Sequence, residues 1–179
     1  VFMQYNHEQD NTFSQLKNKN VDTGLGVERV TAILEGKTDN YESSVWSDVI
    51  KKIEEISGLS YQDEKNKRSM RIIADHIRAI VMISGDNAGI KPSNTDQGYI
   101  LRRLIRRTIR YAKKLNIDIN SNWEQDLANL IIEKYSVYYN ELEKNKETIL
   151  EILKNEKLKF NRTLEKGLRE FEKVVNSLE

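Results

Sequence analysis

The chain has 179 residues and a formal net charge of +1, with one proline, eight glycines and no cysteine. Average usage would give about nine prolines and twelve glycines at this length, so collagen-like and proline-rich architectures are excluded and turn-rich all-β folds are disfavoured. The absence of cysteine excludes a disulfide framework, a thiolate zinc site and a cysteine nucleophile, which fits a reducing, cytoplasmic compartment.

The first 26 residues are the strand-like part of the chain. Residues 1–5 form a short apolar run, and the polar stretch 7–12 is suited to a hairpin turn. Residues 21–26 read as a strand that enters a backbone relaxed by two glycines. Because the chain opens in the middle of an apolar phrase rather than at a methionine, we expect a piece of a longer protein.

From Val27 onward the pattern becomes helical. Apolar residues at helical spacing predict helices over about 46–57, 70–84, 95–115 and 123–139, with Gly58 placed as the residue that ends the first of these. Residues 141–178 contain no proline and carry a near-heptad apolar stripe, which predicts one helix of about 50 Å. The predicted fold class is therefore mainly α, a bundle-like helical domain with a long C-terminal helix, preceded by a small β region.

A Gly-x-Gly turn between Asp22 and Arg29 is a candidate anion site. Glycines let a ligand approach the backbone, a helix start favours anions, and a guanidinium matches phosphate geometry. Asp22 is suited to hold a cation or an ammonium group. An ordinary strand-to-helix turn with a surface arginine is the alternative, and it is the commoner use of this short pattern.

Seven lysines and arginines and no acidic residue occur between positions 97 and 117. Arginine repeats at about one per helical turn match phosphates of a nucleic acid and predict salt-dependent affinity; a solvated basic face is the alternative. The five arginines are Arg102, Arg103, Arg106, Arg107 and Arg110.

Asn94 lies just before this basic helix. Its amide offers a donor and an acceptor and so can read a base edge, although capping or turn chemistry is the usual role of asparagine there. His7 and His76 are far apart and lack cysteine companions, so no metal site is expected. No apolar run reaches 18 residues, so no membrane partner is expected.

Residues 21–29 resemble motif 3 of the class II aminoacyl-tRNA synthetases, in the form that alanyl-tRNA synthetases carry. Further phrases similar to that family follow in its order and extend the resemblance over essentially the whole chain; they lie at residues 1–6, 40–41, 73–79, 92–94, 98–107 and 160–167. The resemblance implies that residues 1–39 end a class II catalytic domain, with its antiparallel sheet, and that residues 40–179 form a helical tRNA-recognition domain.

The resemblance also implies the reaction and the roles of individual residues. Alanine is adenylated with ATP and Mg²⁺ and then transferred to tRNA(Ala). By position, Arg29 resembles the arginine that contacts the ATP phosphate, and Asp22 the carboxylate that pairs with the alanine ammonium. Gly24 lies against the small substrate side chain in the family, and Val1 resembles the apolar wall beside it.

In the family, the helical region reads the acceptor stem of the tRNA, including its G–U pair, and Asn94 resembles the asparagine used there. The five arginines would then lie on or near the stem backbone. Motifs 1 and 2, the editing domain and its zinc site lie outside this chain. We therefore expect a fragment that binds no cofactor and is inactive alone, with tRNA(Ala), alanine, ATP and the remaining domains of its own protein as partners. The alternative is a stand-alone helical RNA-binding or coiled-coil interaction module without catalysis.

Overall fold

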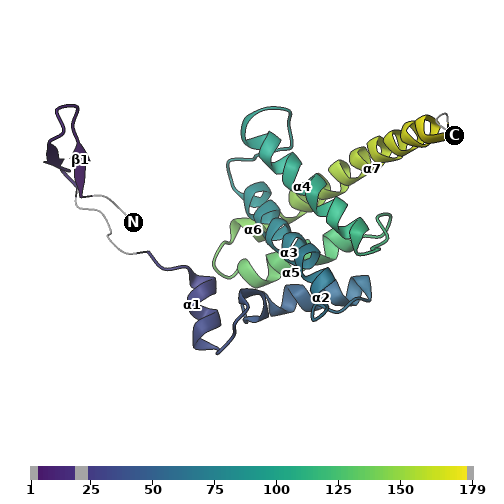
Figure 1. Ribbon diagram of the computed structural model, residues 1–179, viewed down its shortest axis with the longest axis horizontal. Helices are drawn as coiled ribbons and strands as arrows, with labels where there is room; N and C mark the ends of the chain where they lie inside the picture. Colours follow the sequence, from purple (N-terminus) through teal and green to yellow (C-terminus); the bar gives the residue numbers. More distant parts are fainter. Residues whose placement is uncertain (1–3, 19–23, 177–179) are drawn as a thin grey trace. The chain divides into compact units, whose positions relative to one another are not determined.

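The computed structural model describes residues 4–18 and 24–176 (Figure 1). The chain divides into two compact units, Val1–Val45 and Trp46–Glu179, and each is described by itself below. The functional boundary expected between residues 39 and 40 stays a prediction. The expected fold class, mainly helical with a small antiparallel sheet near the N-terminus, is confirmed.

A hairpin opens the first unit. Strand β1 (Tyr5–His7) pairs antiparallel with β2 (Phe13–Gln15), so that Tyr5 faces Gln15 and His7 faces Phe13. The Asp10 side chain accepts a hydrogen bond from the backbone N–H of Thr12 at 3.0 Å, which closes the turn that the polar stretch predicted. The partner strand therefore comes immediately after the turn.

The strand expected over residues 21–26 is not seen where the structure describes it. Residues 21–23 lie outside the described residues, and residues 24–26 have no regular structure. Gly26 is extended, with φ −76° and ψ 113°, and serves as the N-cap residue of helix α1 (Val27–Leu34). Two glycines in three positions give little side-chain packing to hold a strand, and the helix begins at Val27 as predicted. A short 3₁₀ turn, η1 (Asn40–Glu42), follows.

The second unit consists of helices packed around α3 (Glu64–Gly85). Helix α3 contacts α2 (Ser47–Ser57), α4 (Asp96–Lys114), α5 (Trp123–Tyr135), α6 (Glu141–Lys144) and α7 (Lys146–Asn176), and Figure 1 shows α4 crossing over it. Buried side chains from these helices form one core; the largest include Ile53, Met70, Ile73, Ile77, Ile105, Leu127 and Ile131. Gly58 adopts the left-handed conformation at the end of α2, with φ 69°, as predicted.

Three expected helix bounds are wrong. Helix α3 begins at Glu64 rather than near residue 70, and the Asp63 side chain caps it by accepting a hydrogen bond from the backbone N–H of Lys65. Helix α5 ends at Tyr135 rather than at residue 139, and the single helix expected from residue 141 is interrupted at Asn145. The Asn145 side-chain amide donates a hydrogen bond to the carbonyl of Gly85, the last residue of α3, at 2.9 Å. This contact pins the chain between α6 and α7. Helix α7 still has 31 residues and is about 46 Å long.

Within residues 4–18 and 24–176, no helix combines the length and the apolar character needed to cross a membrane.

Candidate nucleic-acid interface

Helix α4 has one buried side and one basic side. Leu101, Ile105 and Ile109 are at most 2% exposed and lie in the core beside α3. An amphipathic helix whose apolar face is buried directs its remaining residues outward. The arginines that the sequence placed on the opposite face therefore lie together at the surface.

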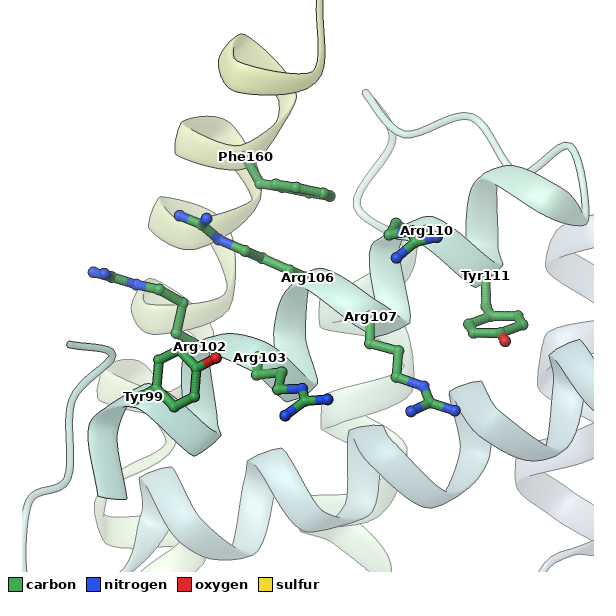
Figure 2. A pocket seen from close by; sticks show the side chains of 8 residues that line it. All are labelled: Tyr99, Arg102, Arg103, Arg106, Arg107, Arg110, Tyr111 and Phe160. Atoms are coloured by element: carbon green, nitrogen blue, oxygen red, sulfur yellow. The ribbon is translucent and has the colours of Figure 1, made fainter. Parts of the chain in front are cut away.

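Figure 2 shows an open groove that these arginines line. Its volume is about 570 Å³, and its walls come from α4 and α7; they are Tyr99, Arg102, Arg103, Arg106, Arg107, Arg110, Tyr111 and Phe160. The structure thus brings all five predicted arginines into one surface, with three aromatic rings among them. A basic groove with aromatic side chains has the character of a nucleic-acid interface.

Two of the five arginines are bound to a carboxylate of this chain. Glu156 of α7 has a side chain only 3% exposed, and its Oε1 accepts a hydrogen bond from Arg106 Nε at 2.7 Å. Arg102 Nε lies 3.4 Å from the same oxygen. The Arg106 guanidinium also lies 5.4 Å from the centre of the Phe160 ring. Because a buried carboxylate needs a charged partner, Arg102 and Arg106 serve to join α4 to α7.

The other three arginines, Arg103, Arg107 and Arg110, are exposed. In the described part of the chain none of them forms an ion pair, and Arg107 lies 5.7 Å from the centre of the Tyr111 ring. Figure 2 shows Arg103 and Arg107 pointing away from Phe160, whereas Arg106 reaches toward it. These uncompensated guanidinium groups have the donors that a bound phosphate requires.

Asn94 lies in the loop that leads into α4 and is exposed. Arg102 donates a hydrogen bond to Asn94 Oδ1, and its other terminal nitrogen lies 3.4 Å from the carbonyl of Pro92. The N-cap residue of α4 is Thr95, so Asn94 does not cap the helix as the alternative interpretation had it. With its oxygen engaged, the amide nitrogen of Asn94 has no hydrogen-bond partner among the described residues and keeps its N–H groups as donors.

The loop that carries Asn94 is held by close contact between its backbone and the first turn of α4. Ser93 N–H donates to the carbonyl of Gly98 at 3.0 Å, and Gly98 is buried in the first turn of α4. A Cβ at Gly98 would lie 2.9 Å from Ser93 Cβ and would also collide with the carbonyl of Lys91. Only glycine therefore allows the loop that carries Asn94 to fold back on α4.

Of the candidate anion site at the start of α1, the structure describes residues 24–29. Arg29 is exposed in the first turn, and a Cβ on Gly26 would lie 3.7 Å from Arg29 Cδ, so the arginine side chain folds back over the glycine turn. Among the described residues, leaving out its chain neighbours, no atom lies within 4 Å of an ideal Cβ at Gly24. Val1 and Asp22 lie outside the described residues. Their proposed contacts with alanine stay predictions.

The two histidines have separate, local partners. The His7 ring lies 5.0 Å from that of Phe13, and His76 Nδ1 lies 3.0 Å from Asp75 Oδ2. This hydrogen bond lowers the pKa of the Asp75 carboxyl. Among the described residues, no group of three histidines or carboxylates is arranged as metal ligands.

Sequence reasoning missed Glu156 as a partner of the basic helix. The residue stands 50 positions after Arg106, in a helix of mixed charge, and no local pattern marks it. Its place on the apolar stripe of α7, between Leu153 and Phe160, is the one sequence signal, because an acid that becomes buried needs a cationic partner.

Comparisons with known proteins place the sequence of this chain in one family. The family model described as tRNA synthetases class II (A) matches residues 1–179. The alanine–tRNA ligase of Borreliella afzelii strain PKo is 46% identical over 179 residues, which are 99% of this chain and 30% of that protein. That of Treponema denticola is 48% identical over 151 residues, 84% of this chain and 25% of that protein.

A more distant relative gives the same result. The alanine–tRNA ligase of Desulfitobacterium hafniense is 37% identical over 180 residues, which are 100% of this chain and 20% of that protein. The chain thus spans about 20–30% of the length of these curated relatives. With a family model matched over all of its residues, the chain belongs to the class II (A) tRNA synthetases, and its relatives among them are alanine–tRNA ligases.

Proposed function

We propose that this chain is part of an alanine–tRNA ligase, an enzyme that uses ATP and Mg²⁺ to join alanine to tRNA(Ala). We further propose that its helical unit binds the acceptor stem of that tRNA. The observation that carries the proposal is the outward face of α4, where Arg103, Arg107 and Arg110 have no acidic partner among the described residues. Such a face attracts a phosphate backbone and releases its counterions on binding.

Asn94 is the proposed base-reading residue. Phosphate contacts position an RNA stem but carry no sequence information, so a separate group has to test the base pair. The free amide nitrogen of Asn94, beside the basic face, offers one donor to an acceptor in the shallow minor groove of an RNA helix. A wobble pair moves those acceptors, and a short side chain held in place senses the shift.

The first unit is proposed to contribute the motif 3 contacts. Arg29 would bind an ATP phosphate, Asp22 the alanine ammonium, and Gly24 and Val1 would enclose the small side chain. The exposed guanidinium of Arg29 in the first turn of a helix supports this role, because charge and helix dipole both favour an anion there.

The isolated chain is expected not to form alanyl-adenylate, because motifs 1 and 2 of the family do not occur among its residues. The test is ATP–pyrophosphate exchange with alanine, using 179-residue protein at high concentration. We expect no exchange above a control without alanine. Robust alanine-dependent exchange would overturn this expectation and show that residues 1–179 hold a working adenylation site.

Binding of tRNA tests the helical unit separately. Reversing charge in the double variant Arg103→Glu, Arg107→Glu should weaken binding and lower the slope of log affinity against log salt by about 2 or more, since two phosphate contacts are lost. The matched control is Lys51→Glu, Lys154→Glu, two exposed lysines on α2 and α7 with the same change of net charge. Equal affinities for the two double variants would refute the role of the basic face.

A further inference from the structure

We propose that a second basic hollow, at the start of α3 and the end of α4, continues the RNA-binding surface and holds RNA phosphates with Arg68 and Lys114. The hollow has a volume of about 440 Å³; its lining residues are Lys65, Asn66, Arg68 and Ser69 of α3 with Tyr111, Lys114 and Leu115. The inference rests on the proposed binding of tRNA by α4 and names a further part of that site.

The two hollows share one lining residue, Tyr111. Tyr111 lines the groove of Figure 2 and also the second hollow. Arg107 lies 5.7 Å and Lys114 5.0 Å from the centre of its ring, so a cation of each hollow lies against the same aromatic side chain. Positive charge therefore continues across Tyr111 without an intervening acid on α4.

The spacing of the cations along α4 forms one ridge. Arg103, Arg107, Arg110 and Lys114 follow each other at three or four residues, which places them on one side of the helix. From Arg103 to Lys114 the helix rises about 16 Å. That length exceeds what one small anion occupies and suits successive phosphates of one strand.

Local ion pairs decide which cations of the second hollow are available. Lys65 Nζ lies 3.0 Å from Asp63 Oδ2, so this lysine of the hollow has an acidic partner. Arg68 and Lys114 are exposed and have no acidic partner in residues 4–18 and 24–176. They carry the net positive charge of the hollow.

The polar lining of the hollow is neutral. Asn66 and Ser69 are 6% and 7% exposed, and the Asn66 amide donates to the carbonyl of Ser60 at 3.0 Å. Neutral polar groups do not repel a phosphate as carboxylates would. The hollow is open and lies beside a larger basic groove. Such a surface suits an extended RNA backbone better than it suits a single small anion.

The test is the double variant Arg68→Gln, Lys114→Gln, with Lys51→Gln, Lys154→Gln as the control of equal charge. Binding of a tRNA(Ala) transcript is measured by fluorescence anisotropy over a salt series. We expect the slope of log affinity against log salt to fall by about 2 in the first variant, one for each lost phosphate contact, and to stay unchanged in the control. Equal thermal unfolding midpoints establish that all variants are folded.

A slope equal to that of the control would overturn the inference, and the proposed function would stand as long as Arg103→Glu, Arg107→Glu still weakens binding. Absence of salt-dependent binding by the unmodified chain would overturn both. A second measurement needs no substitution: bound tRNA should lower the rate at which an amine-reactive reagent labels Lys114 severalfold, relative to Lys51. Unaltered labelling of Lys114 in the complex would also overturn the inference.

Discussion

The two units of this chain carry their candidate functional residues in very different surroundings. In the second unit, Asn94 and the arginines of α4 sit on or beside a helix whose other side is fully buried. In the described residues of the first unit, Ala32 is the one buried apolar side chain. Several large apolar residues there are exposed, namely Tyr5, Phe13, Leu16, Leu25, Val27, Ile33 and Leu34.

This difference in burial indicates which candidate residues are held in place by a core of their own unit and which are not. Helix α1 has eight residues, fewer than the roughly 12–15 at which an isolated helix becomes stable in water, and it brings little core of its own. Helix α4 has 19 residues and is held by a core. The basic face of α4 is therefore positioned within its own unit, whereas the short α1 that carries Arg29 has little core of its own to hold it.

The largest expected effect comes from a buried ion pair of the second unit. Lys157 Nζ donates to Glu124 Oε2 at 2.7 Å and to the carbonyl of Ser121 at 2.6 Å, and both charged side chains are at most 5% exposed. Lys157→Ala leaves an uncompensated buried carboxylate. We expect the free energy of unfolding, measured in denaturant, to fall by about 3–5 kcal/mol.

The control is Lys173→Ala at the far end of the same helix. Lys173 lies 2.7 Å from Glu170 Oε1, but both side chains are about 70% exposed. Exposed pairs of this kind contribute about 0–1 kcal/mol. If the two lysine variants unfold with the same free energy, the second unit does not draw its stability from this buried contact between α5 and α7.

An intermediate effect is expected where α3 ends. A Cβ at Gly85 would lie 2.6 Å from Leu142 Cδ2 and 3.0 Å from Ile149 Cδ1. Gly85→Ala should therefore displace the buried side chains of Leu142 and Ile149 and lower the free energy of unfolding by about 1–3 kcal/mol.

The same substitution in the exposed part of α7 should act in the opposite direction. Gly167 has no atom within 4 Å of an ideal Cβ, and alanine is favoured over glycine inside a helix by about 0.5–1 kcal/mol. Gly167→Ala should raise stability slightly. A stabilising Gly85→Ala would mean that the region joining α3, α6 and α7 is loosely packed.

Local patterns predicted the elements that local physics controls. The turn near Asp10, the left-handed Gly58 and the apolar faces of α2 to α5 all follow from residues close in sequence. The interruption at Asn145 is not marked by its neighbours in sequence, and the hydrogen bond that this residue makes reaches Gly85, 60 residues away. The apolar stripe continues across that point, so periodicity alone predicts one helix.

The sequence predicted which residues the candidate site contains, but not which of them are bound to other side chains. Charge patterning placed the five arginines on one face of one helix, and the structure bears out that grouping. Charge patterning could not separate the paired arginines from the unpaired ones, because the partner of Arg102 and Arg106 is Glu156 on a different helix, α7. Whether an arginine is free for phosphate or committed to a structural ion pair is decided by packing between helices.

The smallest expected effect is that of Leu34→Ala, and its comparison with Leu127→Ala tests the contrast between the units. Leu34 of α1 is 81% exposed, and Leu127 of α5 is fully buried. Leu127→Ala should cost about 2–5 kcal/mol, because it leaves a cavity, whereas Leu34→Ala should stay within about 0.5 kcal/mol. The same side chain is removed in both variants, so only its surroundings differ.

Tryptophan fluorescence is the suitable probe, because both tryptophans of the chain, Trp46 and Trp123, are buried in the second unit. Unfolding in denaturant followed by this signal should have the same midpoint for Leu34→Ala as for the unmodified chain. A loss in Leu34→Ala approaching that of Leu127→Ala would mean that α1 unfolds together with the helical core. The geometry around Arg29 would then be fixed within this chain, and the missing motifs 1 and 2 would remain the reason to expect no adenylate formation.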